Sequence, residues 1–121
     1  MAKIKVNDVI LNYESAGQGD AIVFLHGFTG SLQDWRHQTA AVQDRWRAIA
    51  LDLRGHGQSE APTREEEYSI YLNCADVLGL LNGLGIGRCC LVGHSMGGFT
   101  ALQFAVDHPE RLWGLVCVDT S

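Results

Sequence analysis

The 121-residue sequence lacks the features that mark several specialised classes of protein. It has 9 lysines and arginines against 14 aspartates and glutamates, with no basic cluster, so nucleic acid and membranes are not expected as partners. Its charged N-terminus carries no apolar run of signal-peptide length. The longest clearly apolar stretches, such as residues 21–25, fall far short of the roughly 20 residues that span a bilayer. We therefore expect a cytoplasmic protein.

The four cysteines, at positions 74, 89, 90 and 117, show neither zinc-finger spacing nor a disulfide framework. Cys89 and Cys90 adjoin inside an apolar run, where successive strand residues point to opposite faces. Free cysteine is among the most buried residue types, so we expect buried free thiols, with a redox or metal role as the alternative. No metal and no cofactor is expected.

The sequence also lacks internal repeats, low-complexity tracts and linkers, and its length allows one domain at most. Apolar patterns predict a short hairpin at residues 4–6 and 9–13, broken by Asn-Asp. Strands are then expected at residues 21–25, 47–51, 89–92 and 112–118, and helices after Ser31, from Glu65 onward and at 96–106. The glutamates at 65–67 would form the first turn of the second helix. This alternation predicts an α/β fold, with a mostly parallel twisted sheet and helices on both faces.

Residues 93–98, Gly-His-Ser-Met-Gly-Gly, match the pattern Gly-x-Ser-x-Gly between an apolar strand and a helix of small and apolar residues. A serine in such a tight turn has a strained backbone and an exposed hydroxyl group. Glycines are needed two positions before and after it, because side chains there would collide with a neighbouring strand or helix. The helix N-terminus favours developing negative charge at Ser95. We predict that Ser95 is a nucleophile; the alternative is a glycine-rich loop that only closes a strand.

Residues 26–30, His-Gly-Phe-Thr-Gly, follow the third expected strand and are suited to the other half of an acyl-transfer site. Such a site needs two N–H donors for the oxyanion, one after the nucleophile and one in the loop after the third strand. These are the backbone N–H groups of Met96 and Phe28, although the Phe28 side chain alone would also fit a core position. His26 is expected to be a structural hydrogen-bonding residue rather than a general base.

Residues 52–59, Asp-Leu-Arg-Gly-His-Gly-Gln-Ser, follow the fourth strand, and no chemistry demands them. Asp52 and His56 suggest an acid–base pair, but a sharp loop held by side-chain hydrogen bonds explains them better. Together, in this order, the three segments resemble the α/β-hydrolase fold superfamily. The resemblance implies an eight-stranded sheet, a Ser–acid–His triad in that chain order and a cap after the sixth strand. Residues 1–121 would then be the N-terminal part of one such domain, truncated after the sixth strand, with the cap, last strands and histidine loop absent.

Relatives in that superfamily that cleave carbon–halogen bonds or epoxides carry an aspartate as nucleophile. Ser95 therefore implies hydrolysis of an ester, thioester, lactone or C–C bond of a small molecule. Residues 26–31 with Trp35 are also similar to the menaquinone-pathway synthase that eliminates pyruvate to make SHCHC, although that enzyme is basic where this chain has Phe99. The alternatives are thus an SHCHC synthase-like lyase and a non-catalytic half-fold that binds a small molecule or partner.

The resemblance places the triad histidine beyond residue 121, so the 121-residue chain alone is expected to be inactive. The acid normally follows the seventh strand, but some members place it after the sixth, where Asp119 stands. The alternative for Asp119 is a residue that ends a strand and faces solvent. Residues 112–118 would form a strand that is apolar on both faces. In a chain truncated after this strand it would be a sheet edge, so self-association through it is also predicted.

Overall fold

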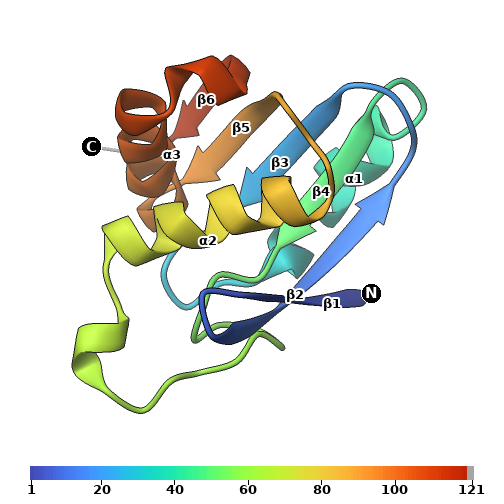
Figure 1. Ribbon diagram of the computed structural model, residues 1–121. Coiled ribbons are helices and arrows are strands. Elements are labelled where there is room, and N and C mark those ends of the chain that lie inside the picture. Colours follow the sequence, from blue (N-terminus) through green and yellow to red (C-terminus); the bar gives the residue numbers. More distant parts are fainter. Residues whose placement is uncertain (120–121) are drawn as a thin grey trace.

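Six strands form one sheet in the computed structural model, which describes residues 1–119 (Figure 1). The strand order is β1-β2-β4-β3-β5-β6. The strands are β1 (Ala2–Val6), β2 (Val9–Ala16), β3 (Ala21–Leu25), β4 (Arg47–Leu51), β5 (Cys89–His94) and β6 (Leu112–Val118). Only the pairs β1–β2 and β2–β4 are antiparallel, and the other three pairs are parallel. The predicted α/β fold with a mostly parallel sheet is confirmed.

The N-terminal hairpin turns at Asn7 and Asp8, as their turn chemistry predicts. Both residues have positive φ, 48° and 63°, which is the backbone of a two-residue hairpin turn that matches the twist of its strands. Val6 and Val9 pair directly beside this turn. The hairpin thereby joins the parallel part of the sheet through β2, which lies next to β4.

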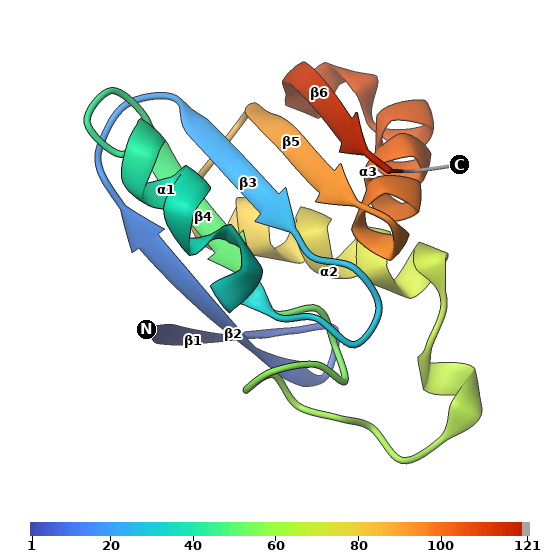
Figure 2. The same ribbon diagram turned by 180° about the vertical axis from the view of Figure 1, so that it is seen from behind.

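Helices cover both faces of the sheet, as Figures 1 and 2 show from opposite sides. α2 (Ile70–Gly83) and α3 (Met96–Asp107) lie on one face, and α1 (Arg36–Val42) lies on the other, preceded by the 3-10 turn η1 (Leu32–Trp35). Alternate strand residues supply two separate cores. Val23 and Leu91 pack on the side of α2 and α3, whereas Phe24 packs against Trp35 on the side of α1.

The segment before α2 differs from the prediction. The glutamates form an isolated 3-10 turn, η2 (Glu65–Glu67), and Tyr68 is extended, so they are not the first turn of the long helix. α2 begins at Ile70 because the Ser69 hydroxyl oxygen accepts the Leu72 N–H at 3.0 Å. Ser31 caps η1 in the same way by accepting the Gln33 N–H, as its position predicted.

The cysteines bear out the prediction of buried free thiols except at Cys117. Cys89 and Cys90 belong to opposite cores, and Cys74 is buried under α3. Burial raises the pKa of Cys74 to about 11 and that of Cys89 to about 12, so both stay protonated thiols at neutral pH. Cys117 is exposed, because β6 lies at the edge of the described sheet.

β6 pairs with β5 alone among the strands of residues 1–119. Its apolar side chains are partly exposed: 41% for Trp113, 39% for Leu115 and 46% for Val116. α3 contacts the strand from one side. Within the same residues, no helix is long and apolar enough to cross a membrane.

Candidate active site

Ser95 occupies the turn between β5 and α3, in a backbone conformation that few non-glycine residues adopt. Its φ is 53° and its ψ is −113°. Hydrogen bonds on both sides hold this conformation: the Ser95 N–H donates to the Val118 carbonyl oxygen at 3.1 Å, and the Phe99 N–H donates to the Ser95 carbonyl oxygen at 3.0 Å. Strained residues of this kind cluster at active sites. The predicted strain at Ser95 is confirmed.

The two glycines that flank Ser95 are required by close backbone contacts. A Cβ atom on Gly93 would overlap the Gly97 carbonyl group. A Cβ atom on Gly97 would overlap the Leu25 carbonyl oxygen and lie 2.5 Å from that of His26. The spacing Gly-x-Ser-x-Gly is therefore a steric requirement of the place where α3 crosses the ends of β3 and β5.

The loop after β3 lies against this turn and offers a backbone donor beside it. Gly27 approaches so closely that a Cβ atom there would lie 3.3 Å from the Ser95 Cβ. The Gly30 N–H donates to the Gly27 carbonyl oxygen at 3.0 Å, with Thr29 at a φ of 67°, and this turn does not use the N–H of Phe28. Met96 is the first residue of α3, so its N–H has no carbonyl group one turn back to bind. These are the two predicted oxyanion donors.

His26 is fully buried and holds the loop after β3 in place through hydrogen bonds. Its Nδ1–H donates to the Gly27 carbonyl oxygen at 2.7 Å, and its Nε2 accepts the Leu53 N–H at 3.0 Å. Burial, the largest cause, lowers its pKa, so the imidazole is neutral at neutral pH. The predicted structural role of His26 is confirmed.

The Asp52 carboxylate joins three segments of the chain by hydrogen bonds, in keeping with the predicted structural role. One oxygen accepts the Leu32 N–H at 2.7 Å, and the other accepts from the Asn12 side-chain amide at 3.0 Å and from the Gln58 N–H at 2.9 Å. His56 instead donates its Nδ1–H to the Arg54 carbonyl oxygen at 3.0 Å. Asp52 and His56 therefore do not form the acid–base pair that their spacing suggested.

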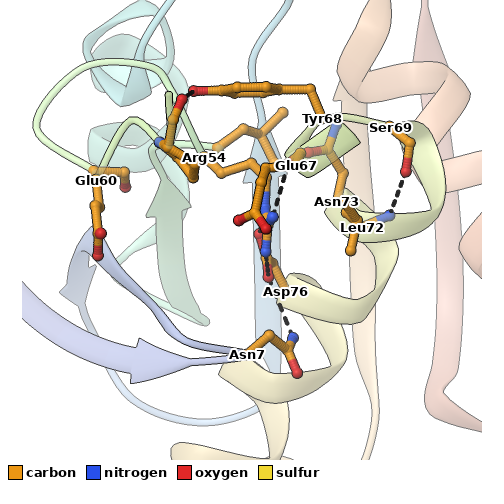
Figure 3. Close-up of polar contacts among 12 residues, drawn as sticks. Asn7, Arg54, Glu60, Glu67, Tyr68, Ser69, Leu72, Asn73 and Asp76 are labelled. Atoms are coloured by element: carbon orange, nitrogen blue, oxygen red, sulfur yellow. Dashed lines mark hydrogen bonds and ion pairs between the residues drawn. The ribbon is translucent and has the colours of Figure 1, made fainter. Parts of the chain in front are cut away.

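A buried ion pair fixes the loop after β4 to α2 (Figure 3). Arg54 donates to both carboxylate oxygens of Asp76, at 2.7 and 2.9 Å, and also to the Glu67 carbonyl oxygen at 2.8 Å. Asn7 of the hairpin turn donates to the same carboxylate at 3.2 Å. The contact with Asp76 raises the pKa of Arg54, which stays charged. Sequence reasoning missed this pair, since nothing in the spacing of residues 54 and 76 signals it.

A pocket of about 300 Å³, here called the loop pocket, opens beside Phe28 and Met96, the two predicted oxyanion donors. Residues of the loops after β3 and β4 and of the starts of α2 and α3 surround it, chiefly Phe28, Arg54, His56, Tyr68, Ile70, Asn73 and Met96. Phe28 is 72% exposed, and its ring meets the His56 ring edge-on, with centroids 5.7 Å apart. No sequence pattern predicts that Tyr68, Ile70 and Asn73 line this pocket, because their positions depend on how α2 packs against the sheet.

Asp119 follows β6 with a φ of 49°, at the same end of the sheet as Ser95. Its side chain is 86% exposed, and its carboxylate lies 3.9 Å from the His94 Nε2. The His94 Nδ1 in turn lies beside Gly27, in the loop after β3. The structure thus brings together Ser95, Phe28, Met96 and Asp119, the four predicted site residues, at one end of the sheet.

Comparison with known proteins shows the same fold. Residues 20–121 match the alpha/beta hydrolase fold family. Epoxide hydrolase 4 of Mus musculus is 36% identical over 119 residues, which are 97% of this chain and 33% of that protein. The crystal structure of epoxide hydrolase VrEH1 from Vigna radiata superimposes with a TM-score of 0.93 at 35% identity, over 96% of this chain and 38% of that one.

A third similar protein, Est816, is described as an N-acyl homoserine lactone degrading enzyme. It has a TM-score of 0.93 at 35% identity, over 98% of this chain and 45% of its own. The chain spans about a third of the length of the curated relatives it matches. Since the family match covers most of the sequence, the chain belongs to the alpha/beta hydrolase fold family.

Proposed function

We propose that this chain carries the nucleophile and oxyanion hole of a serine hydrolase that cleaves an ester, thioester, lactone or C–C bond of a small molecule. The observation that supports this most is the strained Ser95 at the start of α3, beside the backbone N–H groups of Phe28 and Met96. Attack by the Ser95 hydroxyl oxygen on a carbonyl carbon moves negative charge to the carbonyl oxygen. Backbone N–H donors at that point stabilise the charge in the transition state.

The relatives named epoxide hydrolases suggest a different substrate, and the nucleophile distinguishes the two reactions. A carboxylate that opens an epoxide forms an ester, whose carbonyl group water can attack to release the product. A serine that opened an epoxide would form an ether, which has no carbonyl group for the oxyanion donors to stabilise. Ser95 therefore favours acyl substrates, in line with the lactone-degrading relative.

Charge near the site argues against the SHCHC synthase-like alternative. A substrate that eliminates pyruvate carries a carboxylate, which needs a free cation. Among residues 1–119, the cation that lines the loop pocket is Arg54, and Asp76 already neutralises it. The names of the relatives given above add no support for that alternative.

The base and the acid of the triad are part of the same proposal. Among residues 1–119, His26 and His56 each commit Nδ1 to a backbone carbonyl oxygen, and His94 faces Asp119. We expect a histidine outside this chain to serve as base, so that the 121-residue polypeptide alone lacks triad-level turnover. If Asp119 is the acid, Asp119→Asn in the complete enzyme will lower kcat on the order of a thousand-fold. A loss below about tenfold would exclude that role.

The test uses the complete gene product, with p-nitrophenyl acetate and styrene oxide as alternative substrates. Ester turnover is expected, and Ser95→Ala should lower kcat on the order of 10⁴-fold or more, while Ser15→Ala, at an exposed position near the end of β2, leaves it unchanged. Styrene oxide should not be turned over. Ester hydrolysis that survives Ser95→Ala, or faster turnover of the epoxide, would overturn the proposal.

A further inference from the structure

The loop pocket begins where the reacting carbonyl oxygen would lie. Two of its surrounding residues, Phe28 and Met96, supply the proposed oxyanion donors. A group attached to the carbonyl carbon can therefore enter the pocket while the carbonyl oxygen faces those N–H groups. This step rests on the proposed function.

The groups around the pocket indicate which part of a substrate enters it. A carbonyl carbon carries an acyl group and a leaving group, and the leaving group must receive a proton from the catalytic base. The imidazole beside the pocket, His56, is committed to the Arg54 carbonyl oxygen through Nδ1. Its ring also packs against His26, with centroids 4.9 Å apart, and against Phe28. Since His56 is held in this structural role, the leaving group is expected to face elsewhere and the acyl group to face the pocket.

The charge of the pocket restricts the acyl group further. The Arg54 guanidinium is buried and bound by both oxygens of Asp76, and the Glu67 carbonyl oxygen accepts another of its N–H groups. A carboxylate placed in the pocket would lose its hydration without gaining a free cation from residues 1–119, which is costly. Ile70 and Met96 instead offer apolar contact, and methionine adapts its shape to an apolar group.

One polar side chain at the pocket retains hydrogen-bonding capacity. Asn73 is buried, and its side chain makes a single hydrogen bond within residues 1–119, from Nδ2 to the Thr100 Oγ1 at the long distance of 3.4 Å. The remaining hydrogen-bonding capacity of its side-chain amide suits an uncharged polar group on the acyl chain, such as an amide or a hydroxyl group.

From these contacts we propose that the loop pocket is the acyl subsite of the hydrolase, and that it selects uncharged, largely apolar acyl groups over acyl groups that carry a carboxylate. The volume of about 300 Å³ makes the length of the acyl group a second criterion of selection.

The experiment compares esters of p-nitrophenol with the complete gene product: acetate, butyrate, octanoate and the monoester of glutaric acid. For the unmodified enzyme, kcat/KM for butyrate should exceed that for the glutarate monoester at least about tenfold. Ile70→Trp narrows the pocket and should lower the butyrate-to-acetate ratio of kcat/KM about tenfold or more. Tyr68→Ala widens it and should raise the octanoate-to-butyrate ratio.

Tyr71 provides matched controls, because it follows Ile70 on α2 and lines a second groove with Phe99 of α3 but does not line the loop pocket. Ile70 lines both, so the Tyr71 variants show what a change in the second groove alone does. Tyr71→Trp and Tyr71→Ala should leave both ratios unchanged. Thermal unfolding checks that each variant is folded. If Ile70→Trp does not fold, the octanoate-to-butyrate ratio of Tyr68→Ala tests the proposal alone. The acyl-subsite proposal would be overturned if the folded pocket variants left the ratios unchanged or if the Tyr71 variants changed them equally. Preference for the glutarate monoester would overturn it too. Loss of activity in Ser95→Ala would still support the proposed function in that case.

Discussion

At the scale of single residues, the candidate site depends on backbone conformations that its neighbours impose. Ser95 holds a φ of 53°, which costs on the order of 1–3 kcal/mol for a residue with a side chain. Hydrogen bonds to its carbonyl oxygen and from its N–H secure this conformation. The glycines on either side let β5 and α3 approach closely enough to impose it. The strain is thus a consequence of packing, and it keeps Ser95 out of the regular helix that follows.

Gly97→Ala should destabilise the protein because the new methyl group would overlap the Leu25 carbonyl oxygen. Overpacking of this kind costs about 1–3 kcal/mol or more in the free energy of unfolding. Gly87→Ala is the matched control, since a Cβ atom there meets nothing within 4 Å and its φ is not positive. That control should be neutral or stabilise by up to about 1 kcal/mol. Urea denaturation measures both, and equal stabilities of the two variants would contradict the steric argument.

His26 should make the protein less stable as the pH is lowered through a defined range. Burial lowers its pKa in the folded state below the ordinary value of 6.5, so the unfolded chain binds the proton more readily. Its contribution is complete above about pH 6.5 and is lost as the pH falls from there toward the folded-state pKa. Denaturation midpoints between pH 7.5 and 5.5 test this.

In His26→Asn the decrease of stability over this pH window should be smaller than in the unmodified protein, whatever the change in stability at pH 7.5. His37→Asn, at an exposed position on α1, should retain the full decrease. An identical pH dependence in both variants would show that another group is responsible.

At the scale of elements, the site is assembled from loops at the carboxyl ends of β3, β4 and β5, which lie side by side in the sheet. This is where ligands bind in open parallel sheets. The loop after β3 supplies the backbone donor of Phe28, and the loop after β5 supplies Ser95. The loop after β4 supplies no reacting group, but through Arg54 and Asp76 it sets the position of α2 at the edge of the loop pocket.

Asp76→Ala should therefore destabilise the protein strongly, because it leaves the buried Arg54 charge unpaired. Breaking a buried ion pair by removing one partner costs about 3–5 kcal/mol. The exposed pair of Arg64 and Glu66 gives the comparison, and Glu66→Ala should leave stability unchanged within error. Urea denaturation of both variants checks the contrast. A small effect of Asp76→Ala would mean that water reaches Arg54.

At the scale of the whole molecule, much of the fold follows from local sequence patterns. The limits of β3, β4 and β6 agree with the apolar runs, because continuous apolar residues bounded by turn residues are typical of strands in a parallel sheet. The strain at Ser95 also follows locally, from the spacing of two glycines. The prediction that the glutamates open α2 is wrong. Acidic residues favour the N-terminus of a helix, but the Ser69 cap decides where this helix begins.

The remaining features of the site require contacts between residues far apart in the chain. The ion pair of Arg54 with Asp76 and the approach of Asp119 to His94 both depend on which elements lie side by side. The loop pocket has the same origin, because Ile70 and Asn73 reach it only through the packing of α2. No periodicity or motif in the sequence carries this information.

Self-association of the 121-residue polypeptide is the last prediction, and it belongs to the molecule as a whole. β6 has one neighbour in the sheet of residues 1–119, and it carries the partly exposed apolar side chains of Trp113, Leu115 and Val116. It contains no proline, and no charge lies between Arg111 and Asp119 to discourage pairing. Such an edge recruits another strand, so we expect a dimer or larger assemblies of this polypeptide at micromolar concentration.

Sedimentation velocity over a range of concentrations measures this association. Val116→Lys should weaken it, because a charge on an edge strand opposes pairing with a second copy. Val106→Lys is the control, since Val106 is 75% exposed on α3, away from any strand edge, and association should persist in that variant. If instead Val106→Lys abolished association and Val116→Lys did not, the copies would meet through the outer face of α3. A monomer at all concentrations would show that β6 does not recruit a second copy.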